Sequence, residues 1–277
     1  MGLEKWLAKS GRNQRKNKNT MQTSNHESRR FSSASTLLTS ALLAFASCAS
    51  TGFAGPDEAK ILPPKSHPFG LSYTQWSERH WQWLYSIPAS SHPVFQDGNI
   101  DLSAYQPAGR VWFLCGSFSV TPVQSGFFAQ ANRTASVPHG KALFFPIIDA
   151  EASTAEGNGT SQADLTAAAR SFAEPASALA CEIDGQSVQN LEHYQFISPV
   201  FNWGPLPADN LLGLPGGTTT QSVSDGFFLM VAPLPPGQHT IHFTGTAGLA
   251  PNAFTLDITY HLTVTCNGHD EGDEDND

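Results

Sequence analysis

The stretch at residues 254–266 constrains the fold more than any other part of the chain. Apolar residues occupy every second position and alternate with polar ones, mostly threonine. The apolar set is Leu256, Ile258, Tyr260, Leu262, Val264 and Cys266. A period of two predicts a β-strand with one packed and one solvated face, as antiparallel sheets allow.

Six further segments also predict strands. Pro235-Pro236-Gly237 marks a turn into a strand at residues 239–244. Residues 226–232 are apolar at both parities, which indicates a strand buried on both faces. The remaining candidates lie at residues 110–115, 142–148, 179–183 and 193–197.

Two helices interrupt these strands. The capping box Ser72-x-x-Gln75 opens a helix over residues 73–85. Its aromatic face carries Tyr73, Trp76, His80 and Trp83, and we expect that face to cover an open end of the fold. A second helix begins after Ser161-x-x-Asp164 and ends by Pro175.

The balance of elements determines the fold class. Strands outnumber helices and seldom alternate with them, which disfavours a doubly wound α/β fold. We therefore predict an all-β fold, a single antiparallel β-sandwich of about eight strands over residues 55–268. It is jelly-roll-like, with one or two short helices, the first of them N-terminal.

Residues 1–54 read as an export leader with an N-terminal extension, in which Met21 is an alternative start. Arg29 and Arg30 precede an apolar stretch at residues 36–48, which is too short to span a bilayer. Cleavage after Ala54 predicts a secreted or periplasmic protein. Cys48 offers the alternative of a lipid anchor, although Phe45 departs from the usual lipoprotein motif. No transmembrane helix is expected.

The charge distribution excludes one class of partner. The net charge of −9 argues against nucleic-acid binding, which normally needs a basic face. Six of the acidic side chains lie in the last eight residues. Such a block repels itself and has no apolar partner, so residues 269–277 predict a disordered acidic tail. The oligomeric state is left open.

Three cysteines follow the leader: Cys115, Cys181 and Cys266. An odd number permits one disulfide with one free thiol, or three free thiols, and the spacing favours no particular pair. The chain has no Cys-x-x-Cys motif, which disfavours structural zinc.

A group of acidic residues follows the very apolar segment at 142–148. Asp149 and Glu151 would project from the same side of an extended chain, roughly 7 Å apart, and Glu156 follows. With His139 before the strand, they could bind Ca²⁺ or sugar hydroxyls, and Asp149 and Glu151 could also act as an acid–base pair. The simpler alternative is that the strand has left the core and these are its first loop residues.

Trp203 lies in the loop-like segment Asn202-Trp203-Gly204-Pro205. It is the tryptophan that we expect to be exposed, and hence a candidate for contact with a sugar. The alternative is a loop aromatic folded back onto the core.

Three functions remain open. The first is an exported, non-catalytic β-sandwich protein that binds an extracellular or cell-envelope ligand, with glycan as the leading class. The second is a secreted, glycosidase-like hydrolase that uses Asp149 and Glu151. The third is a structural protein of the cell envelope. Common nucleophile, zinc-protease and nucleotide-loop motifs are absent from the chain, which favours the first function.

Overall fold

The structure, a computed structural model, describes residues 59–265. The predicted leader, Cys48, Cys266 and the acidic tail lie outside these residues. Within the described range, no helix is long and apolar enough to cross a membrane. In chain order the elements are η1 (Pro68–Gly70), α2 (Tyr73–Ser86), η2 (Ala89–Ser91), η3 (Pro93–Phe95), β1 (Gly98–Asn99), η4 (Ser103–Tyr105), β2 (Val111–Phe113), β3 (Val120–Val123), β4 (Gly126–Pro138), β5 (Ala142–Ser153), α3 (Gln162–Ala173), β6 (Ser177–Ile183), β7 (Gln186–Ser187), η5 (Leu191–Tyr194), β8 (Gln195–Ile197), β9 (Phe201–Trp203), β10 (Thr220–Val231), β11 (Gly237–Ala247) and β12 (Ala253–Thr265).

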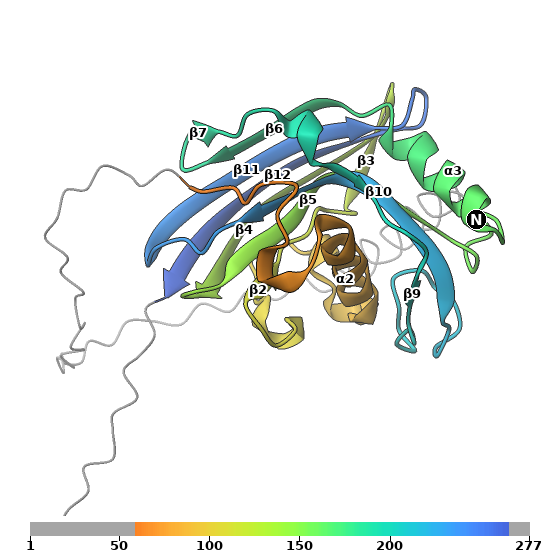
Figure 1. The fold of residues 1–277 in the computed structure, drawn as a ribbon, viewed down its shortest axis with the longest axis horizontal. Coiled ribbons are helices and arrows are strands. Elements are labelled where there is room, and N and C mark those ends of the chain that lie inside the picture. Colours follow the sequence, from red (N-terminus) through yellow and green to blue (C-terminus); the bar gives the residue numbers. More distant parts are fainter. Residues whose placement is uncertain (1–58, 266–277) are drawn as a thin grey trace, which may run out of the picture.

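The strands form two sheets that lie one above the other (Figure 1). One has seven strands, in the order β1-β4-β12-β11-β6-β7 with β3 beside β4. The other has five, in the order β2-β5-β10-β8 with β9 beside β10. The wholly antiparallel arrangement that we predicted is wrong, because β4 runs parallel to β12 and to β1, and β2 runs parallel to β5. Alternation reports which face of a strand is buried but not the direction of its neighbour. The jelly-roll connection stays a prediction.

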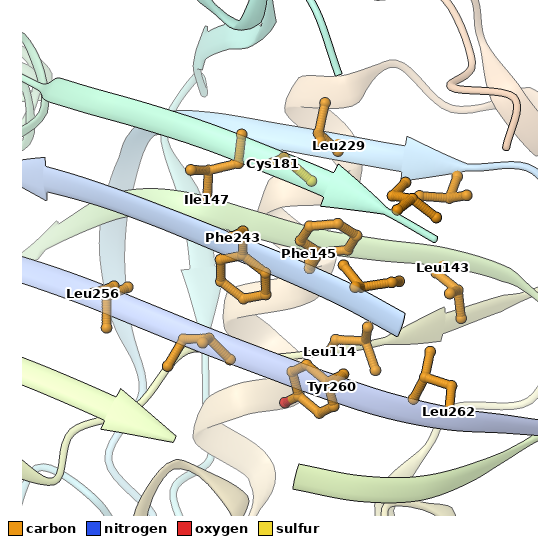
Figure 2. Packing of buried hydrophobic residues seen from close by; sticks show 14 of the residues in the cluster. Leu114, Leu143, Phe145, Ile147, Cys181, Leu229, Phe243, Leu256, Tyr260 and Leu262 are labelled. Atoms are coloured by element: carbon orange, nitrogen blue, oxygen red, sulfur yellow. The ribbon is translucent and has the colours of Figure 1, made fainter. Parts of the chain in front are cut away.

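The apolar faces of the two sheets meet in the main core. The alternation at the end of the chain is confirmed: the inward residues of β12, such as Ile258, Tyr260 and Leu262, are fully buried. They pack with β11 and with the inward residues of β5 (Figure 2). Phe145 and Phe243 stack across this core with their ring centroids 5.1 Å apart.

Strands β5 and β10 are the middle of three layers. Phe144 and Phe228 project away from the main core, stack at 5.6 Å, and pack under α2. The prediction of a strand buried on both faces is thus confirmed for β10. Our placement of the aromatic helix is wrong, because α2 covers the outer face of the five-stranded sheet rather than an open end (Figure 1). That face is apolar, so an aromatic helix face fits it, and loop residues such as Leu206 and Leu211 pack there beside α2.

The two helix boundaries follow from local chemistry. Ser72 and Gln75 form the predicted capping box of α2, and Ser161 and Asp164 form that of α3. Helix α3 ends at Ala173, shortly before Pro175, which cannot donate a helical hydrogen bond.

Strand β4 has no counterpart among the predicted strands. Three of its inward side chains are small: Ala129, Ala131 and Ala135. A fourth inward side chain is that of Arg133, which is fully buried. Small residues and a cation give a weak apolar periodicity. The cysteines within the described range, Cys115 and Cys181, are buried free thiols, so no bridge joins these two.

Candidate functional site

Strand β5 continues past the point where we expected it to end. It pairs with β10 as far as Ser153, with a bulge opposite Phe227 and Phe228. Asp149 and Glu151 are therefore strand residues, and the alternative that they begin a loop is wrong. The two residues lie two positions apart in one strand, so their side chains project from the same face of the sheet, the face that α2 covers.

Glu151 accepts hydrogen bonds from three different elements. Its Oε2 accepts from the Tyr85 hydroxyl of α2 at 2.8 Å. Its Oε1 accepts from the Trp203 indole N–H of β9 at 2.8 Å and from the Ser222 hydroxyl of β10. A carboxylate has about four acceptor positions, and Glu156 occupies a further one. Both oxygens of Glu151 are thus engaged by the protein itself.

Glu156 is the protonated partner in this pair. Burial and the neighbouring charge of Glu151 raise the pKa of Glu156 well above its ordinary value. A neutral carboxyl can donate to Glu151, and the Oε2 of Glu156 accepts from the Ser153 hydroxyl at 2.8 Å. The fold therefore favours the neutral form of Glu156, with its carboxyl hydrogen-bonded to Glu151.

Asp149 differs from both glutamates because one of its oxygens is unused. Its Oδ2 is buried and has no hydrogen-bond partner among the described residues. Burial, and then the charge of Glu151, raise the pKa of Asp149 to about 8. Gly226 lies opposite on β10, where a Cβ would come within 2.4 Å of the Asp149 Cβ, so glycine makes room for this carboxyl.

These residues line a cleft of about 320 Å³. One wall holds Trp81 and Tyr85 of α2, and the opposite wall holds Phe172 of α3 and Phe254 of β12. Mostly apolar walls with a few convergent polar groups are typical of small-molecule sites, and the volume lies at the small end of their range. A second cavity of about 470 Å³, between residues 59–61 and β6–β7, has no carboxyl in its lining. We therefore place the candidate site beside β5.

The predicted site residues are brought together in part. Asp149, Glu151 and Glu156 line the cleft. Trp203 is not part of the lining, but its indole N–H donates to Glu151. The expected exposure of Trp203 is wrong: it is 1% exposed in β9, and its N–H is used by Glu151. His139 lies exposed at the turn between β4 and β5, at the far end of β5 from the acids.

Tyr85 and Ser222 were not predicted as site residues. Ser222 and Ser224 are buried polar residues at alternate positions of β10, just before its apolar run. Polar residues at that spacing in a buried strand were a usable signal, because each needs a partner. Tyr85 gave no separate signal in the sequence, because it is one of several aromatic residues in α2.

The predicted metal ligands are not arranged as a metal centre. Within residues 59–265, no group of three or more His, Cys, Asp or Glu side chains is placed to hold a metal ion. The Glu151 oxygens already accept from protein donors.

Glu151→Gln is expected to lower the free energy of unfolding by about 2 kcal/mol. The substitution replaces one acceptor oxygen by an NH₂ group, which would then face a hydrogen-bond donor and leave that donor without an acceptor. Glu156→Gln is the matched control. Its amide can donate to Glu151 and accept from Ser153, as the neutral carboxyl does, so we expect a loss below about 0.5 kcal/mol. Urea unfolding near neutral pH measures both variants. Equal losses would contradict the role of Glu151 as the shared acceptor of these hydrogen bonds.

The comparisons with known proteins identify no family. No protein-family model and no curated protein matches the chain. A chain in the structure of PbICP-C in complex with falcipain-2 is 13% identical, with 57% of this chain and 100% of that chain covered and a TM-score of 0.21. A chain in the solution structure of amebosin is 8% identical, with 61% and 100% covered and a TM-score of 0.17. At these TM-scores neither similarity supports a conclusion about fold or ligand.

Proposed function

We propose that this protein is an exported, non-catalytic binding protein and that its ligand occupies the cleft beside β5. The observation that carries the proposal is the unused, buried Oδ2 of Asp149 in a cleft with apolar walls. A buried polar atom without a partner is costly, and a ligand that supplies the missing hydrogen bond removes that cost. The export leader that the sequence predicts at residues 1–54 supports this part of the proposal.

The same geometry favours binding over hydrolysis. An acid–base pair needs one carboxylate with a free lone pair and one protonated carboxyl, both facing the substrate. Glu151 has both oxygens engaged, and the neutral Asp149 lacks an accessible basic partner. The glycosidase-like alternative therefore has less support.

A glycan remains one ligand class for the cleft. A neutral carboxyl can donate to and accept from the hydroxyls of a sugar, while the apolar walls suit the faces of its rings. A purely structural protein of the cell envelope would have no need of the unpaired carboxyl.

A thermal-shift panel of Ca²⁺, EDTA, polysaccharides and peptides tests the proposal on the purified protein. A ligand at about 100 times its dissociation constant adds about 2.7 kcal/mol of stability. For a chain of this size that is a Tm shift of about 5–10 °C.

Two variants locate the binding. Ser171 is exposed on α3 and lines the cleft, so Ser171→Trp would fill the cleft and remove the shift. Ala163 is exposed on the same helix, about two turns before Ser171 and outside the lining, so Ala163→Trp is the control that keeps the shift. A shift that survives Ser171→Trp, or no shift with any ligand, would count against the proposal.

A further inference from the structure

Strand β5 has one edge without a strand partner. On one side it pairs with β10 from Leu143 to Ser153. On the other side it pairs with β2 only from Ala142 to Phe144. Beyond Phe144, no strand within residues 59–265 pairs with that second edge. The cleft lies along this part of β5.

The hydrogen bonds around Ser153 show which backbone groups face the open edge. The Thr154 N–H donates to Gln221 on the β10 side. Ser153, one residue earlier, bonds on the other side: its N–H donates to the Asn158 side chain and its C=O accepts from the Asn158 N–H. Backbone groups alternate along an antiparallel strand, so those of Asp149 and Glu151 also point to the open edge. These groups have no hydrogen-bond partner in the described part of the chain.

The lining of the cleft shows that it runs over this edge. Four consecutive residues of β5, from 149 to 152, line it, although successive side chains lie on opposite faces of the sheet. The walls accordingly come from both layers. Leu211 and Leu212 lie with α2 on one side, and Phe172 and Phe254 lie on the other. A strand laid along the edge would direct its alternate side chains to these two apolar walls.

The charge of the cleft is of one sign. Its Asp and Glu residues are Asp149, Glu151 and Glu156, and no Lys, Arg or His lines it. A cationic side chain on the α2-facing side of an added strand would lie beside Asp149. There it would supply the donor that the buried Oδ2 lacks.

We propose that the ligand of the cleft is an extended polypeptide segment that adds a strand to the open edge of β5. Its backbone bonds to Asp149 and Glu151, its apolar side chains contact the two walls, and a Lys or Arg faces Asp149. This inference rests on the proposed function, because it names the ligand of the same cleft. The free backbone groups favour a peptide over a glycan, since strand addition derives its affinity from a ladder of main-chain hydrogen bonds.

A displayed library of random linear decapeptides, selected on the purified protein, tests the inference. We expect enriched peptides with apolar residues at alternate positions and a Lys or Arg among them. Each enriched peptide is then made in two N-methylated forms, one for each set of alternate amides. Methylation on the edge that faces β5 is expected to weaken binding at least tenfold, since it removes two or more hydrogen bonds. Methylation on the outer edge is expected to change binding less than threefold.

The cleft variants complete the test. Binding should be lost in Ser171→Trp and retained in Ala163→Trp. Enriched peptides that tolerate both N-methylated forms equally, or a selection that enriches no peptide sensitive to Ser171→Trp, would overturn the inference. If a polysaccharide gives a thermal shift that Ser171→Trp removes while no peptide binds, the proposed function stands and strand addition is wrong.

Discussion

Arg133→Ala is expected to lower the free energy of unfolding by about 4 kcal/mol, the largest effect of any single substitution considered for this chain. Arg133 lies on the inward face of β4 and is fully buried. Its Nη1 donates to the Tyr260 hydroxyl at 2.7 Å and to the Cys115 carbonyl at 2.9 Å. Its Nη2 and Nε donate to the carbonyls of Gly116 and Gln96, both at 3.0 Å.

The size of this effect comes from the acceptors that the substitution leaves behind. The carbonyls of Gly116 and Gln96 would lose their cationic donor, and each unsatisfied buried acceptor costs about 1–3 kcal/mol. The Cys115 carbonyl would keep its bond from Tyr260. The Tyr260 hydroxyl would keep its donation to the Cys115 carbonyl, at 2.8 Å, and the weaker donation that it receives from the Cys115 N–H, at 3.3 Å. A cavity the size of the missing side chain adds to the loss.

Urea unfolding measures this prediction, with the midpoint compared at constant slope. Gln130→Ala is the control, because Gln130 is exposed on the same strand and its loss should stay within about 0.5 kcal/mol. Arg133→Lys keeps a charge but cannot reach all four acceptors, so an intermediate loss is expected if the alanine variant does not fold. A midpoint for either Arg133 variant equal to that of the wild type would refute the role of this network.

Asp149→Asn is expected to stabilise the protein in mildly alkaline solution, by about 3 kcal/mol. Burial raises the pKa of Asp149 from 3.8 to about 8, so the fold favours the neutral carboxyl. The support that this group gives to folding is complete below pH 3.8 and is lost as the pH rises through about 8. A shift of that size corresponds to roughly 6 kcal/mol at most, and water in the cleft screens part of it.

Two buried histidines act in the opposite direction at lower pH. Burial lowers the pKa of both His80 and His92 from 6.5 to about 4, so their contribution to stability is lost as the pH falls from 6.5 toward 4. The effect of Asp149 is therefore clearest above pH 6.5. There the wild type should lose stability with rising pH, while Asp149→Asn should show a shallower slope. The remaining slope comes from other acids whose pKa values burial raises, such as Glu156 and Asp225.

Thermal unfolding from about pH 6.5 to 9 checks this expectation. Glu192→Gln is the matched control, since Glu192 is exposed and its replacement removes one acidic charge outside the cleft. Parallel pH profiles for the wild type and Asp149→Asn would show that Asp149 is ionised in the fold. That result would also remove the neutral carboxyl from the proposed site.

The sequence by itself determined the features that neighbouring residues encode. Alternation predicted the inward face of β12, and apolar residues at both parities predicted that β10 is buried on both faces. The capping boxes placed the starts of α2 and α3. Asp149, Glu151 and Glu156 were also predicted as one cluster, because they lie close together along the chain.

The tertiary structure alone decided how these pieces meet. The parallel pairing of β4 with β12, the burial of Arg133 and the use of the Trp203 indole by Glu151 each join residues far apart in the sequence. Whether a carboxyl is ionised and whether a strand edge is covered depend on donors and neighbours supplied by other elements. Patterns with a period of two or 3.6 residues report which face of an element is buried, but not what it is buried against.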